Sequence, residues 1–492
     1  MNDTQNALDQ RKPIDTSTRS GQRIERLIRQ MYTTSELQPQ GLDVSSAPLG
    51  ALVPPDVFYN AAISNLHDEA LAADIRKWKN NGYHRVVENI SLCGYPFLFN
   101  PAAKRRVFAI EANSTQQAEA NNAMRMSFFG VPVANHIPES PYFVIHVRRS
   151  NLLSDTLNQL SQTPVHNLRK QLKVVFADED GIDQGGVTKE FFQLLIKEIF
   201  DEKYGMWKYD PETRTHWFNP GCPSEMSMEF VLIGILVGLA IYNGTLLDIH
   251  FPLALYKKLL NLSVGLYDLR GLNPSVANSL QALINYTGED VEDVFCLDWT
   301  AAYEAFGEAI TVELVPNGKT MPVTSSNRIE YVTKYVDWLL NKSIESSYSQ
   351  FARGFAMAVS GHTLQLCRPE ELELLVTGTP HLDFHALELV TNYEGGYNKD
   401  HPTIKAFWNV VHSLPEDLKM KLLMFATGSA KAPIGGLGKL LFRIQRMGPD
   451  SDMLPTASTC FNTLLLPDYK TESKLRERLT VAISECAGFG LK

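Results

Sequence analysis

The sequence predicts an α+β protein with a large, mainly helical unit followed by a small unit of mixed helices and strands. Apolar residues recur at helical spacing through most of residues 92–378. The segment Thr377-Gly378-Thr379-Pro380 then joins a glycine that can cap a helix to a proline that stops one, which indicates a short connector. After this connector, short strand-like runs alternate with helical ones. We therefore expect two packed units that meet near residue 378.

Composition excludes several classes of protein. The chain has 492 residues, of which 44% are hydrophobic and 21% charged, and this is ordinary for a globular protein with more than one domain. Its net charge of -9 argues against nucleic-acid binding. Two short basic runs, Lys104-Arg105-Arg106 and Arg148-Arg149, are interpreted as solvated faces or structural ion pairs.

The first residues lack the pattern of a secretory signal, and no membrane span is expected. The longest apolar run, 230–242, is shorter than the ~20 residues that cross a bilayer. Its Gly234-x-x-x-Gly238 spacing indicates close helix packing inside a soluble domain instead.

Residues 1–50 are polar and rich in proline, which predicts a flexible N-terminal tail. One short helix is expected within it at 23–31, with an apolar face and a basic face that could dock a partner. Residues 51–91 are predicted to form a helical N-terminal extension, with helix across 56–81.

The large unit is expected to span 92–378. Its strands are predicted at 142–147 and 172–176. Its helices are predicted at 188–200, 229–242, 329–340 and 345–359. A last helix begins at Pro369, carries Glu370 and Glu371 near its positive end, and stops at Gly378.

The small unit is expected to span 379–492. Helices are predicted at 404–412 and 415–427 and from Ser473 onward, and strands at 440–444 and 460–466.

An acidic, glycine-rich segment at 178–186 lies between a predicted strand and a predicted helix. Its glycines do not follow the spacing of a phosphate-binding loop, and its carboxylates would repel a phosphate. A calcium loop of the EF-hand type would need glutamate where Lys189 stands. We interpret the segment as an acidic turn.

The cysteines make neither a disulfide framework nor a zinc motif. They lie far apart, without a Cys-x-x-Cys pair, which favours a reducing compartment, so the cytoplasm and the nucleus are the expected locations. Cys367 and Cys486 read as packing residues. Cys460 stands out because a polar, proline-containing loop precedes it and a strand-like run follows it. A reactive thiol needs such access, although a buried structural cysteine remains the alternative.

A cysteine protease would need a histidine and an orienting Asn or Asp beside the thiol. The local signatures of papain-like and caspase-like enzymes are absent. His401 and His412 fall in the same unit as Cys460, but the sequence does not bring either of them to it.

From about Leu92 to Lys492, the chain resembles the HECT-type ubiquitin-protein ligases. The resemblance rests on many motifs in the family's order. They are Val147-Arg148-Arg149, Phe176 to Gly186, Lys189-Glu190-Phe191-Phe192, Trp217-Phe218-Asn219-Pro220, Gly238 to Asn243, Arg368 to Leu375, Gly395-Gly396-Tyr397, Phe425 with Thr427-Gly428, Pro433 with Gly435-Gly436, and the segment from Leu454 to Asn462 around Cys460.

The resemblance implies a two-lobed fold in which a large N-lobe, 92–378, docks a ubiquitin-conjugating enzyme (E2). A small C-lobe, 379–492, would move on a hinge at Gly378, Thr379 and Pro380. Cys460 matches the catalytic cysteine, which would accept ubiquitin as a thioester and pass it to a substrate lysine. Phe489 matches a phenylalanine that helps place the C-lobe for transfer.

The resemblance also implies a groove for the conjugating enzyme and no requirement for a metal or cofactor. The groove residues are Val276, Leu280, Tyr286, Phe295, Leu297 and Tyr331. Without the resemblance, these residues read as core.

One position departs from the family. Ser458 stands where the family usually has histidine, two residues before the cysteine. A hydroxyl cannot act as a base near neutral pH, so slower discharge of ubiquitin onto lysine is expected, with thioester formation retained. Two rival functions remain, a non-catalytic scaffold with the same fold and a cysteine hydrolase of ubiquitin-like modifiers. The first 90 residues match no substrate-recruiting module.

Overall fold

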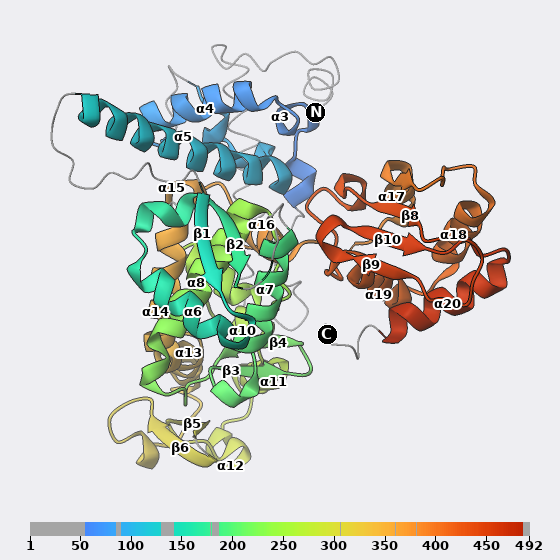
Figure 1. The fold of residues 1–492 in the computed structure, drawn as a ribbon. Helices are drawn as coiled ribbons and strands as arrows, with labels where there is room; N and C mark the ends of the chain where they lie inside the picture. Colours follow the sequence, from blue (N-terminus) through green and yellow to red (C-terminus); the bar gives the residue numbers. More distant parts are fainter. Residues whose placement is uncertain are drawn as a thin grey trace, which may run out of the picture.

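The computed structural model describes residues 55–84, 90–128, 142–177, 179, 186–305, 307–359, 361–379 and 381–485. The predicted helix at 23–31, most of the acidic segment 178–186, Pro380, Cys486 and Phe489 lie outside these residues. Helices dominate up to residue 379, and a smaller unit of mixed helices and strands follows to one side (Figure 1). The predicted α+β class is confirmed.

The N-terminal extension is built from short helices and one long one. They are η1 (Pro55–Phe58), α3 (Ala61–Ser64), α4 (Asp68–Asn80), η2 (Leu92–Gly94), η3 (Pro96–Leu98) and α5 (Pro101–Phe128). The predicted continuous helix over 56–81 is therefore broken, because Asn60 and Asn65 cap the two ends of α3. Helices α4 and α5 lie side by side across one end of the molecule, over a small core of their own (Figure 1).

A buried carboxylate ties the loop after α4 back to that helix. Asp74 accepts hydrogen bonds from the Ser91 hydroxyl at 2.9 Å and from the backbone N–H groups of Leu92 and Cys93 at 2.8 and 2.9 Å. Satisfying three donors with one carboxylate compensates for its burial.

The core of the large unit is helix α8 (Ser227–Asn243) packed on α14 (Glu345–Ala358). Every residue from Phe230 to Ile241 is buried. A Cβ on Gly234 would collide with the backbone of Phe351, and one on Gly354 would collide with that of Val231. The glycines thus allow the close packing that the sequence predicted. Among the described residues, no helix combines the length and the apolar character that a bilayer span needs.

A parallel pair of strands covers this core. β1 (Tyr142–Val147) and β2 (Gln171–Phe176) pair from Tyr142 with Gln171 to Val147 with Phe176, as the predicted strands required. The next helix, α7 (Gly186–Ile199), buries Phe191, Phe192 and Leu195.

The remaining elements of the large unit are short. They are η4 (Arg149–Asn151), α6 (Leu152–Gln162), η5 (Val165–Arg169), η6 (Glu202–Tyr204), β3 (Trp207–Asp210), β4 (Thr215–Phe218), η7 (Ser224–Met226), α9 (Leu253–Leu259), α10 (Leu266–Leu269), α11 (Pro274–Asn285), α12 (Val291–Phe295), β5 (Thr300–Ala305), β6 (Glu308–Glu313), η8 (Gly318–Thr320), α13 (Arg328–Leu340), η9 (Lys342–Ile344), α15 (Gly361–Leu364) and α16 (Pro369–Thr377). β5, β6 and α12 lie at the end opposite α4 and α5 (Figure 1).

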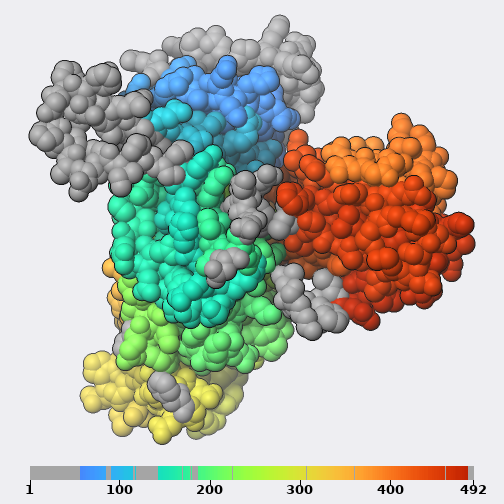
Figure 2. Space-filling model, viewed as in Figure 1, coloured from blue at the N-terminus to red at the C-terminus, as the bar shows by residue number. Residues whose placement is uncertain are grey.

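The C-terminal unit, residues 381–485, has a separate hydrophobic core. Its elements are α17 (Phe384–Val390), β7 (Asn392–Glu394), α18 (Pro402–Ser413), α19 (Glu416–Thr427), η10 (Leu437–Lys439), β8 (Arg443–Arg446), β9 (Thr456–Ser458), η11 (Thr459–Phe461), β10 (Thr463–Leu466) and α20 (Glu472–Glu485). The sheet order is β7-β8-β10-β9, with only β9 antiparallel to its neighbour. In the space-filling view, this unit borders the large unit along one side (Figure 2).

Two predicted strands in this unit are placed differently. The strand expected at 440–444 begins only at Arg443, because the 3-10 turn η10 precedes it. The strand expected at 460–466 begins at Thr463, because Asn462 adopts a left-handed conformation with φ of 48° and ends the turn η11. Cys460 therefore lies in a turn between two strands.

The basic runs noted in the sequence are structural, as expected. Lys104 is fully buried, and its ammonium lies 2.5 Å from Glu371. Arg106 pairs with Asp68, and Arg149 pairs with Glu190.

The pair of Lys104 and Glu371 joins three separate segments. The Tyr59 hydroxyl of the extension donates to one Glu371 oxygen at 2.7 Å. Lys104 of α5 donates to the other, as does the backbone N–H of Arg368 at 2.8 Å. Glu371 therefore caps the start of α16 and holds the extension against it.

We expect Glu371→Ala to destabilise the protein by about 3–5 kcal/mol, because Lys104 would be left charged and unpaired in the core. Urea unfolding followed by tryptophan fluorescence measures this change. Glu416→Ala, in the first turn of α19 and 72% exposed in its pair with Lys419, is the control and should change stability by less than about 1 kcal/mol. Equal effects of the two substitutions would contradict the role assigned to Glu371.

Candidate functional site

The backbone places Cys460 at the sheet edge of the C-terminal unit. It occupies the middle of η11, between β9 and β10, which pair antiparallel with Ser458 opposite Thr463. Asn462 closes the turn in the left-handed conformation that asparagine tolerates better than most residues. Its side-chain amide donates to the Leu441 carbonyl at 3.3 Å. The turn is thus fixed to the segment that leads into β8.

Helix α7 of the large unit contacts this turn directly. The Lys189 ammonium donates to the Thr427 carbonyl and lies 3.3 Å from the side-chain oxygen of Asn462. The Gln193 amide donates to the carbonyl of Gly428, the residue that caps α19 with φ of 72°. Two side chains of one helix therefore hold both the turn that contains Cys460 and the end of α19.

Other thiols are less suited to nucleophilic chemistry. Burial raises the pKa of the Cys222 thiol to about 11 and that of Cys367 to about 12. Burial, with a contribution from the Asp74 carboxylate, also raises the pKa of Cys93 strongly. These thiols stay protonated near neutral pH and are poor nucleophiles. Cys296 is exposed and donates to the Asp293 carbonyl, so it is the natural comparison for Cys460.

The two histidines considered in the sequence are engaged elsewhere. The ring of His401 accepts from the Thr403 N–H at 3.3 Å and caps α18. His412 lies 2.7 Å from Glu388. Ser458 is partly buried in β9. Neither histidine is therefore placed to act as the base of a cysteine protease triad with Cys460.

Two apolar side chains beside the turn are exposed. Phe461 is 52% exposed and Leu441, whose carbonyl is bound by Asn462, is 73% exposed. Exposed apolar side chains on one part of the surface are typical of a site that meets another macromolecule. Neither exposed side chain is predicted from the sequence, because both residues fall in predicted strands, where alternate residues would be buried.

The six groove residues named from the resemblance all belong to the large unit, in or packed against its hydrophobic core. Val276, Tyr286, Phe295 and Leu297 are partly buried, and the rings of Tyr286 and Phe295 meet edge to face with centroids 5.3 Å apart. Leu280 and Tyr331 are only 5% and 3% exposed. These two can shape the surface from beneath, and the binding role of the set stays a prediction.

Two further residues extend this surface. Val294 on α12 is 51% exposed and Ile329 at the start of α13 is 56% exposed. Arg328, next to Ile329, donates to the Tyr286 carbonyl, which places the start of α13 beside the groove. Val294 and Ile329 are apolar residues that lie off the buried faces of their helices. Such apolar residues on a polar helix face can be recognised in the sequence.

The connector between the two units is glycine-dependent. Gly378 ends α16 with φ of 80° and ψ of -179°, a backbone region that almost only glycine adopts. Thr379 then exchanges two 2.9 Å backbone hydrogen bonds with Ala432 of the C-terminal unit. Nearby, burial lowers the pKa of the Lys431 ammonium, while the Glu373 carboxylate of α16 counters this effect. The predicted hinge role of Gly378, Thr379 and Pro380 is not tested by these contacts.

Comparison with known proteins points to the same family that the sequence motifs resemble. The sequence profile described as "HECT-domain (ubiquitin-transferase)" matches residues 193–492. The human probable E3 ubiquitin-protein ligase HERC3 is 40% identical over 443 residues, which cover 89% of this chain and 42% of HERC3. Human probable E3 ubiquitin-protein ligase HECTD2 is 40% identical over 458 residues, covering 90% of this chain and 57% of HECTD2.

The chain thus spans about half the length of these relatives. The aligned regions leave only about a tenth of this chain unmatched, whereas residues 1–91 make up a larger share of it. The match therefore reaches upstream of Leu92, into the region predicted as an N-terminal extension.

We expect Lys189→Met to loosen the turn that contains Cys460, because a hydrogen bond to a charged group contributes about 1.5–3 kcal/mol. Hydrogen–deuterium exchange of the peptide covering 459–463 should accelerate by about tenfold or more, since 1.4 kcal/mol corresponds to a factor of ten. Lys197→Met, on the same helix but exposed, is the control. Unchanged exchange in Lys189→Met would mean that α7 does not hold the turn.

Proposed function

Because the chain belongs to the HECT-domain (ubiquitin-transferase) family, we propose that it is an E3 ubiquitin-protein ligase. It accepts ubiquitin from a conjugating enzyme as a thioester on Cys460 and transfers it to lysine side chains of protein substrates. The observation that carries this proposal is the family match over residues 193–492, which includes Cys460. The position of Cys460 in an anchored turn, beside exposed apolar side chains, is consistent with it.

The proposed reaction has two acyl transfers. The Cys460 thiolate attacks the carbonyl carbon of the ubiquitin thioester, a new carbon–sulfur bond forms, and the conjugating enzyme leaves as its thiolate. A substrate lysine amine then attacks the new thioester, an amide bond forms, and Cys460 leaves as a thiolate while the amine loses a proton. Exchange between two thioesters is close to balanced in energy, so positioning is the main contribution required of the protein. Neither step needs a metal or a cofactor.

The conjugating enzyme is proposed to dock on the groove of Tyr286, Phe295 and their neighbours, extended by Val294 and Ile329. This surface belongs to α11, α12 and α13, whereas the Cys460 turn lies against α7. The bound partner and Cys460 are thus held by different elements, and movement of the C-terminal unit would bring them together.

We propose that residues 92–378 act as an N-lobe and 379–492 as a C-lobe that moves on Gly378, Thr379 and Pro380. The separate cores of the two units and the glycine-only conformation at Gly378 support this division. Phe489 is proposed to help place the C-lobe during transfer to lysine. The proposed locations are the cytoplasm and the nucleus.

A non-catalytic scaffold is the second candidate, and Ser458 is the observation that favours it. Such a protein would bind conjugating enzymes without accepting ubiquitin. A cysteine hydrolase, the third candidate, would release free modifier and accumulate no conjugates.

A single-turnover transfer assay tests the proposal. With a ubiquitin-charged conjugating enzyme, the full chain should give an adduct that thiol reductant removes. Cys460→Ala should abolish this adduct, and Cys460→Ser should replace it with an ester that resists reductant. Cys296→Ala, which removes the exposed thiol, should leave the adduct unchanged.

The other outcomes identify the rival functions. No adduct with several conjugating enzymes that still bind would support the scaffold. Release of free ubiquitin from conjugates by the wild type, lost in Cys460→Ala, would support the hydrolase.

A second assay tests the role of Ser458. Histidine here would supply a base for the attacking amine, so Ser458→His should speed discharge of a preloaded chain onto free lysine by about tenfold or more. Loading from the conjugating enzyme should change little. Ser458→Asn controls for size without adding a titrating group, and equal discharge by the histidine and asparagine variants would refute the prediction.

A further inference from the structure

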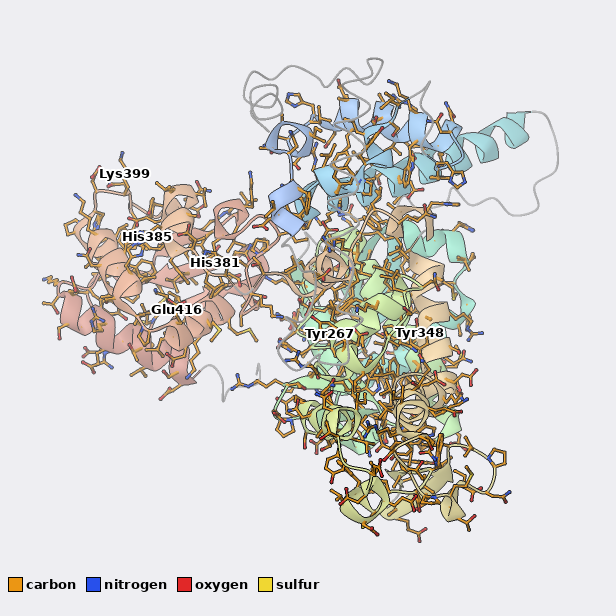
Figure 3. All side chains as sticks on the ribbon, turned by 180° about the vertical axis from the view of Figure 1, so that it is seen from behind. Tyr267, Tyr348, His381, His385, Lys399 and Glu416 are labelled. Carbon is orange, nitrogen blue, oxygen red and sulfur yellow. The ribbon has the colours of Figure 1, made fainter. Side chains whose placement is uncertain are left out.

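Three metal-ligating side chains gather in the C-terminal unit, away from the Cys460 turn. His385 and Glu388 come from α17 and His412 comes from α18, and one ligand atom of each lies within 4.8 Å of the others. His385 is labelled in Figure 3, together with His381 just before the same helix. No spacing in the sequence indicates this group of metal ligands, because His412 belongs to a different helix from His385 and Glu388.

The two helices are held firmly enough to present these side chains. Residues 385 and 388 are three apart and therefore share one face of α17. The adjacent face buries Phe384 and Leu387, and Val411 beside His412 is fully buried in the same core. The Asp383 carboxylate caps α17 by accepting from the N–H groups of residues 385 and 386, each at 3.0 Å.

His412 is already oriented toward the carboxylate. Its Nε2 lies 2.7 Å from an oxygen of Glu388. One side of its ring stacks on His385 with centroids 3.9 Å apart, and its ring also stacks on Trp408 at 5.7 Å. Trp408 is itself fixed, because its indole N–H donates to the Tyr393 hydroxyl at 3.0 Å.

The cluster is open to solvent. The side chain of His412 is 23% exposed and that of Glu388 is 40% exposed, and His385 is exposed as well. A metal ion can therefore reach all three groups, and water can fill a fourth position. Two imidazoles and one carboxylate are a donor set that zinc prefers.

We propose that His385, Glu388 and His412 form a zinc-binding site that links α17 to α18. Each imidazole gives a nitrogen lone pair and the carboxylate gives an oxygen, and the ring nitrogen that binds the metal must carry no proton. The stacked rings lie within 15° of parallel, so their lone pairs do not converge. Zinc binding therefore requires the exposed His385 ring to turn out of the stack.

Titration of the full chain with zinc chloride, followed by calorimetry, tests the site. The cysteines are first alkylated with iodoacetamide, since thiols such as that of the exposed Cys296 could bind zinc themselves. The wild type should take up one equivalent, and zinc should raise its thermal unfolding midpoint. His385→Ala should weaken binding by about tenfold or more and abolish the thermal shift.

Two further variants complete the test. His381→Ala removes an exposed histidine four residues earlier and should bind zinc like the wild type. Glu388→Gln, which keeps the size of the side chain, should also weaken binding, and its circular dichroism without zinc reports whether it is folded. No zinc uptake by the alkylated wild type, or equal uptake by His385→Ala, would overturn the proposal. Neither result depends on ubiquitin transfer.

Discussion

The buried carboxylate of Glu371 is the constraint on which the arrangement of the large unit depends. It accepts from Tyr59 of the extension, Lys104 of α5 and the backbone of Arg368, so three segments far apart in the chain meet at one group. A charge without water is stable only when such donors surround it. Because Glu371 lies at the start of α16, the same group also sets where that helix begins. Its other end, Gly378, is where the C-terminal unit starts.

The contacts between the two units are of a different kind. They consist mainly of hydrogen bonds to backbone carbonyls from Lys189 and Gln193, the paired Thr379 and Ala432, and the charges of Glu373 and Lys431. Each unit has its own hydrophobic core, although Ile434 of the C-terminal unit packs against the core of the large unit. When the units separate, these groups can bond to water instead, at a net cost of about 0.5–3 kcal/mol for each hydrogen bond, whereas separating a shared hydrophobic core would expose its apolar surface to water. The proposed movement of the C-terminal unit would therefore break polar contacts that water can replace.

Much of the fold could be predicted from the sequence, because many of its helices and strands carry apolar residues at a regular spacing. The strands at 142–147 and the helices around α8, α13 and α14 lie within a few residues of their expected bounds. Helix α5 was missed, because its apolar residues do not follow a single face. The sequence predicts strand at Cys460, whereas the structure has a turn there. The left-handed conformation of Asn462 depends on contacts with Leu441 and Lys189, and no local sequence pattern contains these contacts.

The site was predicted only in part, for a related reason. Cys460 could be singled out in the sequence, because a polar loop with a proline precedes it and a strand-like run follows it. Lys189 could not, because it lies more than two hundred residues away and reaches the turn only through the packing of α7. The cluster of His385, Glu388 and His412 was likewise invisible, since its members meet only when α17 and α18 pack together.

The groups around the Cys460 turn have a common chemical character. Lys189, the Gln193 amide and the Asn462 amide donate hydrogen bonds to backbone carbonyls around the turn, whereas His401 and His412 of the same unit are engaged at α18 and at Glu388. Donors stabilise negative charge, such as a thiolate or the oxyanion formed during acyl transfer, but they cannot take up a proton. In the proposed reaction, exchange between thiols needs only the first property, whereas attack by a lysine amine needs both. In the proposed reaction, the described contacts of the turn would thus favour receipt of ubiquitin, and the proton of the attacking amine would need another acceptor, such as water or the substrate.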